Sequence, residues 1–247
     1  RSGFPSATES SPTTLDPVGA ADWDALRASA HKLLDASIDR MQSAKEGRVW
    51  TPVPEDMRAS LRAPVPTDGV PHDERSARLE QFLPYGVGNT HPRFFGWVHG
   101  SGAPGSVLPE LVGAAMNANC GGRDHAAIHI EKQVLSWARQ IMGFPADAGA
   151  LLVSGTSMAT IVALKSARDR YLGFEASRVH GLATAQSALP GGGNLVGYMA
   201  DGAHSCIKRA FDVLGLGSVA LRGIPTTDAF TMDVGALRAA IAADRAA

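Results

Sequence analysis

The chain has 247 residues, of which 45% are hydrophobic and 19% charged, and its net charge is −1. This composition is typical of a globular protein with a sizeable core. The near-zero charge gives no electrostatic argument for binding nucleic acid or an anionic membrane, and no apolar run approaches the ~20 residues of a membrane span. Cys120 and Cys206 form no motif. We therefore expect a reducing, cytoplasmic setting, although the sequence leaves a disulfide between them open.

The first third of the chain is expected to combine a flexible arm, short helices and an extended connector. Residues 1–20 are rich in Ser, Thr and Pro and predict the arm. Five prolines between residues 48 and 71 predict the connector. Helical periodicity predicts helices at 22–46, 55–62 and 73–83. The first helix is amphipathic and needs a partner surface, so segment 21–84 is interpreted as one helical and extended unit.

The segment from Tyr85 to Gly105 combines six glycines with several large aromatic and histidine side chains. Such a segment is a poor helix and a poor strand. It suits a loop that lines a pocket, where Phe94 and Trp97 would supply flat walls beside His99. The alternative is a packed surface loop.

Two helices are predicted next, at 106–119 and 126–142, from their apolar stripes. His125 and His129 are four residues apart, a spacing that can hold a metal on one helix face. No third ligand is evident nearby, so we predict no metal site.

A strand, a turn and a helix are predicted around residues 151–171. Leu151–Val153 is an apolar run too short for a helix, Gly155 allows a turn, and Thr156 and Ser157 are good helix starters. The N-terminus of such a helix points several backbone N–H groups and the positive end of the helix dipole at one spot. That spot suits a phosphate or a carboxylate, although a simple capped helix is the alternative.

The second half of the chain alternates strands and helices, which predicts an α/β fold with parallel strands. Strands are predicted at 195–200 and 219–224, helices at 207–214 and 233–247, and an irregular segment with a mobile loop, Pro190–Gly193, at 174–193. Ligands of such folds gather at the carboxyl ends of the strands. This rule predicts that Gly155–Ser157 and Asp201–His204 lie along the same rim.

Ser154–Ala159 also resembles the nucleophile segment of subtilisin-like proteases, with His99-Gly100 as a partial echo of their histidine motif. The second histidine of that motif is missing, and no aspartate motif precedes His99. Because a nucleophilic serine needs a base and an orienting group, a serine hydrolase is the less favoured alternative.

Several motifs occur in the same order as in one enzyme family. They are His91-Pro92-Arg93-Phe94-Phe95-Gly96-Trp97, Asn117-Ala118-Asn119, Glu131 with Trp137 and Gly143-Phe144-Pro145, Ser154-Gly155-Thr156-Ser157-Met158-Ala159, and Ala200-Asp201-Gly202-Ala203-His204-Ser205. From about Trp23 to its end, the chain resembles the group II decarboxylases that depend on pyridoxal phosphate (PLP), which include aromatic-amino-acid and glutamate decarboxylases.

The resemblance implies a fold and a role for each matching residue. The fold would be the large domain of fold type I PLP enzymes, with residues 85–247 forming the first part of its mainly parallel sheet. Gly155, Thr156 and Ser157 match the turn that holds the cofactor phosphate. His204 matches the catalytic histidine that stacks on the pyridine ring and helps to position the substrate. Phe94, Trp97 and His99 fall in the loop that lines the substrate pocket.

The resemblance also implies partners and an activity. The reaction would be decarboxylation of an L-amino acid, with an aromatic one as a candidate. The enzyme would be a homodimer in which segment 21–84 is the dimerisation segment that packs against the partner subunit. The family's cofactor-binding lysine and the aspartate that pairs with the pyridine nitrogen follow the histidine motif, and the chain reaches Ala247 before either. We therefore expect this chain to be the N-terminal half of the enzyme, inactive without its C-terminal half. An aminotransferase, another lyase of the same fold and a non-catalytic relative remain alternatives.

Overall fold

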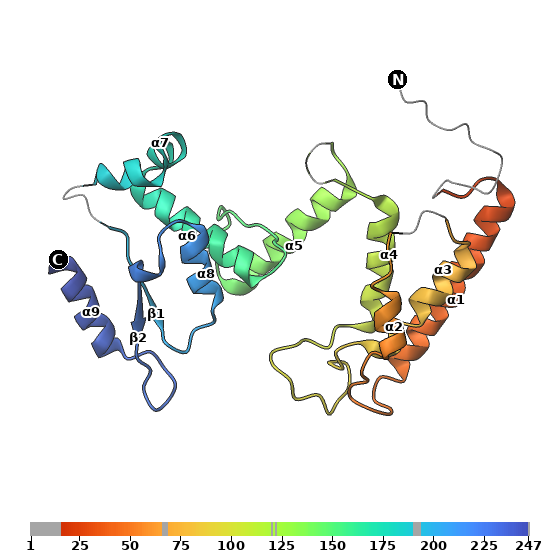
Figure 1. The fold of residues 1–247 in the computed structure, drawn as a ribbon. Helices are drawn as coiled ribbons and strands as arrows, with labels where there is room; N and C mark the ends of the chain where they lie inside the picture. Colours follow the sequence, from red (N-terminus) through yellow and green to blue (C-terminus); the bar gives the residue numbers. More distant parts are fainter. Residues whose placement is uncertain (1–15, 66–68, 120, 122, 190–193, 247) are drawn as a thin grey trace, which may run out of the picture. The chain divides into compact units, whose positions relative to one another are not determined.

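The computed structural model describes residues 16–65, 69–119, 121, 123–189 and 194–246. It divides into two compact units, unit 1 up to residue 119 and unit 2 from residue 120 (Figure 1). Residues 1–15 of the predicted arm and the predicted mobile loop, Pro190–Gly193, lie outside the described residues. The boundary predicted between segment 21–84 and segment 85–247 remains a prediction. None of the helices in the described ranges has the length and apolar character needed to cross a membrane.

Unit 1 is built from helices and turns. It contains α1 (Ala20–Gln42), α2 (Glu55–Ser60), α3 (His72–Glu80), the 3-10 turns Leu83–Tyr85 and Pro104–Ser106, and α4 (Val107–Met116). Helix α1 packs against α3. It ends four residues before the predicted position: the N–H of Ser43 makes the last bond of the i to i−4 series, to Asp39, and the N–H of Ala44 bonds to the carbonyl of Met41, three residues back.

Unit 2 carries a small parallel sheet among helices. It contains α5 (Ala126–Met142), α6 (Thr156–Leu172), α7 (Phe174–Ser187), β1 (Gly197–Ala200), α8 (Cys206–Val213), the 3-10 turn Ser218–Ala220, β2 (Leu221–Ile224) and α9 (Val234–Ala246). The two strands are parallel, with Gly197 opposite Leu221 and Ala200 opposite Ile224. Helix α8 connects them, which confirms the predicted parallel α/β pattern.

The core of unit 2 lies between α8 and the sheet. Its buried apolar side chains are Met199, Cys206, Ala210, Phe211, Leu214 and Ile224, and in unit 2 Leu172 on α6 and Ala185 on α7 are buried as well. The Phe211 ring lies directly on Gly197, where an added Cβ would come within 2.4 Å of the Cζ atom of the ring. The glycine in β1 therefore lets α8 approach the strand closely.

Changing Gly197 to alanine is expected to lower the free energy of unfolding by about 2 kcal/mol, because the buried Phe211 ring must move out of its place. The measurement is urea unfolding followed by circular dichroism. Gly149→Ala is the matched control, since an added Cβ there meets no atom within 4 Å. Equal stability of the two variants would contradict the close packing of α8 on β1.

Two predicted features are wrong in this structure. Leu151–Val153 is not a strand: Leu151 and Leu152 are 60% and 55% exposed, and among the described residues no strand pairs with them. A short extended run needs a neighbouring strand to satisfy its backbone groups. Residues 174–187, predicted to be irregular, form α7, with a break at Gly181 where φ is 78°. That glycine obscured the helical pattern of the segment.

Candidate functional site

The first turn of α6 offers a set of hydrogen-bond donors to one spot. The first backbone bond of the helix runs from the N–H of Ala159 to the carbonyl of Gly155, at 3.1 Å. The N–H groups of the preceding residues therefore have no acceptor within the helix. Thr156 and Ser157 are both exposed and add two hydroxyl groups. Gly155 has an extended backbone, and no atom lies within 4 Å of the position of a Cβ, so a ligand can approach closely.

His204 lies just before α8, in the turn that follows β1. Its Nδ1 atom accepts the backbone N–H of Cys206 at 3.2 Å, and its side chain is exposed. Because Nδ1 acts as the acceptor, the neutral ring carries its proton on Nε2. The ring is thus held by its own helix and keeps an N–H donor on the opposite side.

Helices α6 and α8 run side by side in the same direction (Figure 1). The Oγ1 atom of Thr160 lies 3.8 Å from Sγ of Cys206, and Nη1 of Arg168 donates to the carbonyl of Leu214 at 3.0 Å. Both contacts join residues that are 46 positions apart, so an equal step along each helix leads from one contact to the other and the two helices are parallel. Parallel helices in constant register have their N-termini at the same end. The Gly155–Ser157 turn and His204, which precede these two helices, therefore lie at one end of the pair.

The three predicted pocket residues of unit 1 come together in the loop before α4. The His99 ring centroid lies 5.8 Å from that of Phe94 and 5.6 Å from that of Trp97, in tilted geometry. Trp97 has a φ of 40°, a left-handed conformation that costs a bulky residue about 1–2 kcal/mol. Such strain occurs preferentially at ligand-binding sites. The loop is closed by a hydrogen bond of 2.6 Å from the Asn89 side chain to the carbonyl of Gly100.

The candidate site thus falls into two groups, one in each unit. The structure brings the rings of Phe94, Trp97 and His99 together in unit 1. In unit 2 it places the Gly155–Ser157 turn and His204 at the same end of α6 and α8. His129, at which we predicted no metal site, has its Nε2 atom 2.5 Å from the Oδ1 atom of Asp124.

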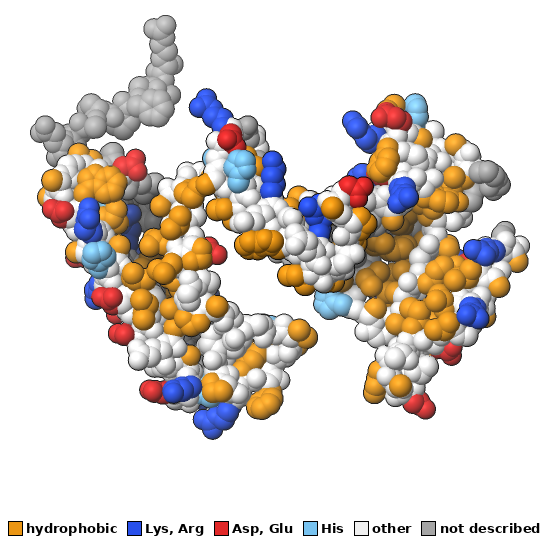
Figure 2. All heavy atoms as spheres, turned by 180° about the vertical axis from the view of Figure 1, so that it is seen from behind, with side chains coloured by type: hydrophobic (Ala, Val, Ile, Leu, Met, Phe, Trp, Pro, Cys, Tyr) orange, Lys and Arg blue, Asp and Glu red, His pale blue; other side chains and the backbone are white. Residues whose placement is uncertain are grey.

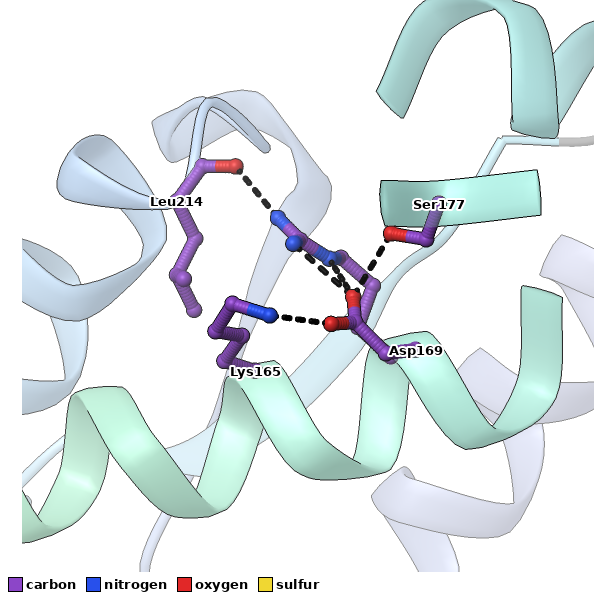
Figure 3. Close-up of polar contacts among 5 residues, drawn as sticks. Lys165, Asp169, Ser177 and Leu214 are labelled. Carbon is purple, nitrogen blue, oxygen red and sulfur yellow. Dashed lines mark hydrogen bonds and ion pairs between the residues drawn. The ribbon is translucent and has the colours of Figure 1, made fainter. Parts of the chain in front are cut away.

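The sequence did not predict the buried carboxylate of Asp169 (Figure 3). Its side chain is 2% exposed and accepts a hydrogen bond from the Nζ atom of Lys165, with which it forms an ion pair. It also accepts hydrogen bonds from the Nε atom of Arg168 at 2.9 Å and from the Ser177 hydroxyl on α7 at 2.8 Å. The only signal in the sequence is the i, i+4 spacing of Lys165 and Asp169, which is common on solvated helix faces.

The environment of Asp169 shifts its pKa. Burial of the carboxyl raises the pKa, but the hydrogen bonds from Lys165, Ser177 and Arg168 lower it further than burial raises it, from 3.8 to about 2. A group whose pKa is lower in the folded state contributes stability above its unfolded pKa. That contribution is lost as the pH falls from about 4 towards 2.

Replacing Asp169 by asparagine is therefore expected to lower the free energy of unfolding at pH 6 by about 3 kcal/mol, because Arg168 loses its buried partner. The gap between wild type and variant should narrow as the pH falls below about 4. Urea unfolding at a series of pH values measures it, with Asp228→Asn as the exposed control. A gap that does not change with pH would contradict an ionised Asp169.

Comparison with known proteins identifies the family. Residues 54–247 match the model of the pyridoxal-dependent decarboxylase conserved domain. Aromatic-L-amino-acid decarboxylase from Bacillus atrophaeus is 28% identical over 89% of this chain and 43% of its own length. Tyrosine decarboxylase from Oryza sativa subsp. japonica is 29% identical over 96% of this chain and 45% of its own. The chain therefore belongs to the pyridoxal-dependent decarboxylase family.

Solved structures support the same fold. Mouse CSAD superposes with a TM-score of 0.77 over 92% of this chain and 47% of its own, at 21% identity, a likeness that concerns the fold alone. Oryza sativa TDC with PLP and tryptamine gives a TM-score of 0.74 over 94% of this chain and 48% of its own, at 26% identity. The chain thus has the first part of the fold type I architecture and spans about half the length of these relatives. The match to this family argues against the serine hydrolase alternative.

The residues at the start of α6 fit the cofactor of this family of PLP-dependent enzymes. A phosphate group needs several donors converging on its oxygens, and helix N-termini supply them together with a favourable dipole. Backbone N–H groups, two exposed hydroxyls and the open space beside Gly155 form such a donor set. His204, at the same end of the helix pair, offers a flat ring held by one nitrogen, which suits stacking on an aromatic cofactor.

Proposed function

We propose that this chain forms the phosphate-binding and ring-stacking part of a PLP-dependent decarboxylase that acts on an L-amino acid. Family membership supports PLP as the cofactor and decarboxylation as the activity. The observation that carries the assignment of the site is the parallel register of α6 and α8, with Thr156 and Ser157 at the same end of the pair as His204.

Each part of the site would have a distinct task. Thr156 and Ser157 would hold the phosphate with their hydroxyl and backbone donors, beside the space at Gly155. His204 would stack on the cofactor ring through its face, orient the substrate through Nε2–H, and remain fixed by its bond to Cys206. When bound, PLP supplies an electron sink for the carbanion that remains after loss of carbon dioxide.

An aromatic amino acid is the favoured substrate. Several relatives are named for aromatic amino acids, including aromatic-L-amino-acid and tyrosine decarboxylases, although a Drosophila melanogaster glutamate decarboxylase is 30% identical over 67% of this chain. The clustered rings of Phe94, Trp97 and His99 would provide apolar walls for an aromatic side chain.

The protein is proposed to act in the cytoplasm as a homodimer, with the C-terminal half of the enzyme completing the site. Large apolar side chains are exposed on both units, and Figure 2 shows many of them on one face of the molecule. On α1 and α4 they include Trp23, Ile38, Leu108, Leu111 and Val112. Exposed apolar surface of this extent favours contact with further protein. The low cysteine content and the buried thiol of Cys206 favour a reducing compartment.

The direct test is an assay of the intact protein with PLP and a panel of L-amino acids. We expect release of labelled carbon dioxide from tyrosine, tryptophan or phenylalanine, together with the matching amine by mass spectrometry. Turnover of an amino acid without release of carbon dioxide would instead identify another activity of the same fold. Absence of PLP binding would refute the proposal.

A further inference from the structure

We propose that Asp169 is a positioning residue for the cofactor site, because it locks Arg168 onto the end of α8 and thereby fixes the register between α6 and α8. This inference rests on the proposed function. Asp169 lies in the last turn of α6, at the opposite end from the Gly155–Ser157 turn. It would act on the site only through the two helices.

Two contacts between α6 and α8 define their register. Thr160 meets Cys206 near the N-termini, and Arg168 meets Leu214 near the C-termini. The contacts are eight residues apart on both helices, or about 12 Å along a helix axis. The first contact, a weak one at 3.8 Å involving sulfur, leaves the helices able to slide. The second is a charge-assisted hydrogen bond of 3.0 Å to the carbonyl of the C-cap residue, and it opposes sliding.

Asp169 determines where the Arg168 guanidinium points. The Arg168 side chain is only 12% exposed, and both Nε and Nη2 lie 2.9 Å from the same oxygen of Asp169. This leaves Nη1 directed at Leu214. Without the carboxylate, the guanidinium would be a nearly buried charge without its counter-ion and would turn towards solvent.

Asp169 is itself held from two further directions, by one side chain on its own helix and by one on α7. Lys165 lies one helical turn earlier on α6, and Ser177 donates from α7 (Figure 3). Because α7 is thereby fixed to α6, these contacts join α6, α7 and the end of α8 around one buried carboxylate. This cluster, called the Asp169 clamp, consists of Lys165, Arg168, Asp169, Ser177 and the carbonyl of Leu214. A group of this kind fixes geometry more than it adds net stability.

The first measurement reports the register without the cofactor. In the intact protein, Thr160→Cys places a thiol beside Cys206, and disulfide formation requires a narrow range of distances between the two residues. Adding Asp169→Asn should slow this crosslink by about threefold or more, as measured by mass spectrometry of the peptide pair. Asp244→Asn is the matched control, because Asp244 also accepts bonds from an arginine, Arg222, and a hydroxyl, Tyr198, but does so between the sheet and α9.

The second measurement is the dissociation constant of PLP, from fluorescence titration of the intact protein carrying its native Thr160. Asp169→Asn and Arg168→Lys should each weaken PLP binding about tenfold, because the turn and His204 no longer share a fixed separation. Arg168→Lys is less disruptive to folding, since it keeps the charge, but it cannot hold Asp169 and Leu214 at once. Asp244→Asn should bind PLP as wild type does.

The outcomes separate the two proposals. Slower crosslinking together with weaker PLP binding, both absent in Asp244→Asn, would support the positioning role. Unchanged crosslinking, or PLP affinity within twofold of wild type in both clamp variants, would overturn it and leave the proposed function standing. Absence of PLP binding by the wild type would overturn the proposed function and with it the positioning role, whereas crosslinking would still report whether Asp169 sets the register.

Discussion

Replacing Thr156 by valine and Ser157 by alanine together is expected to weaken PLP binding by the intact protein about 100-fold. Each hydroxyl would donate a hydrogen bond to a charged phosphate, worth about 1.5 kcal/mol, and two such losses correspond to about two powers of ten in affinity. The backbone N–H groups at the start of α6 remain, so binding should weaken and not vanish. Fluorescence titration with PLP measures the effect.

The control for this prediction is the same pair of side-chain changes at two exposed residues on another helix. Thr184→Val with Ser187→Ala alters two exposed hydroxyl residues on α7 and should leave the affinity for PLP unchanged. If the α6 variant binds PLP within threefold of wild type, the start of α6 is not the phosphate site.

Replacing His204 by phenylalanine is expected to lower kcat/KM about 100-fold while PLP affinity stays within threefold of wild type. The phenyl ring keeps a flat face for stacking but lacks the Nε2–H donor that would orient the substrate. His204→Ala removes both functions, so it should lower PLP affinity as well. Steady-state release of carbon dioxide and PLP titration measure the two effects separately.

His180 on α7 provides the comparison, because it is also an exposed histidine and lies outside the proposed site. His180→Phe should leave both constants unchanged. Both His204 variants lose the acceptor for the Cys206 N–H, so a modest loss of stability of about 1 kcal/mol is expected in each. A His204→Phe enzyme with normal kcat/KM would remove this residue from the catalytic machinery.

Local pattern was sufficient to predict the helices other than α7, and the parallel pairing of the two strands. The helix predicted at 126–142 matches α5 at both ends, because the apolar stripe continues to Gly143, whose φ of 70° closes the helix. The strands predicted at 195–200 and 219–224 are present but start two residues later. The family resemblance predicted the fold and the PLP-dependent class, which the comparisons confirm.

Tertiary contacts account for what the sequence could not predict. An apolar run such as Leu151–Val153 becomes a strand only where another strand offers hydrogen bonds, and its sequence does not contain that information. The Asp169 clamp depends on a serine in a helix that was expected to be irregular and on a carbonyl 45 residues away from Asp169. The assignments of Gly155, Thr156, Ser157 and His204 to the cofactor, and of Phe94, Trp97 and His99 to the substrate, remain predictions.

The equal spacing of the contacts on α6 and α8 limits how this part of the chain can change in length. One residue inserted between Thr160 and Arg168 would turn the rest of α6 by about 100° and advance it by about 1.5 Å, so both contacts could not form together. The same insertion between α7 and β1 would alter neither interval. Length variation among natural relatives should therefore accumulate in that connection and be absent from both eight-residue intervals.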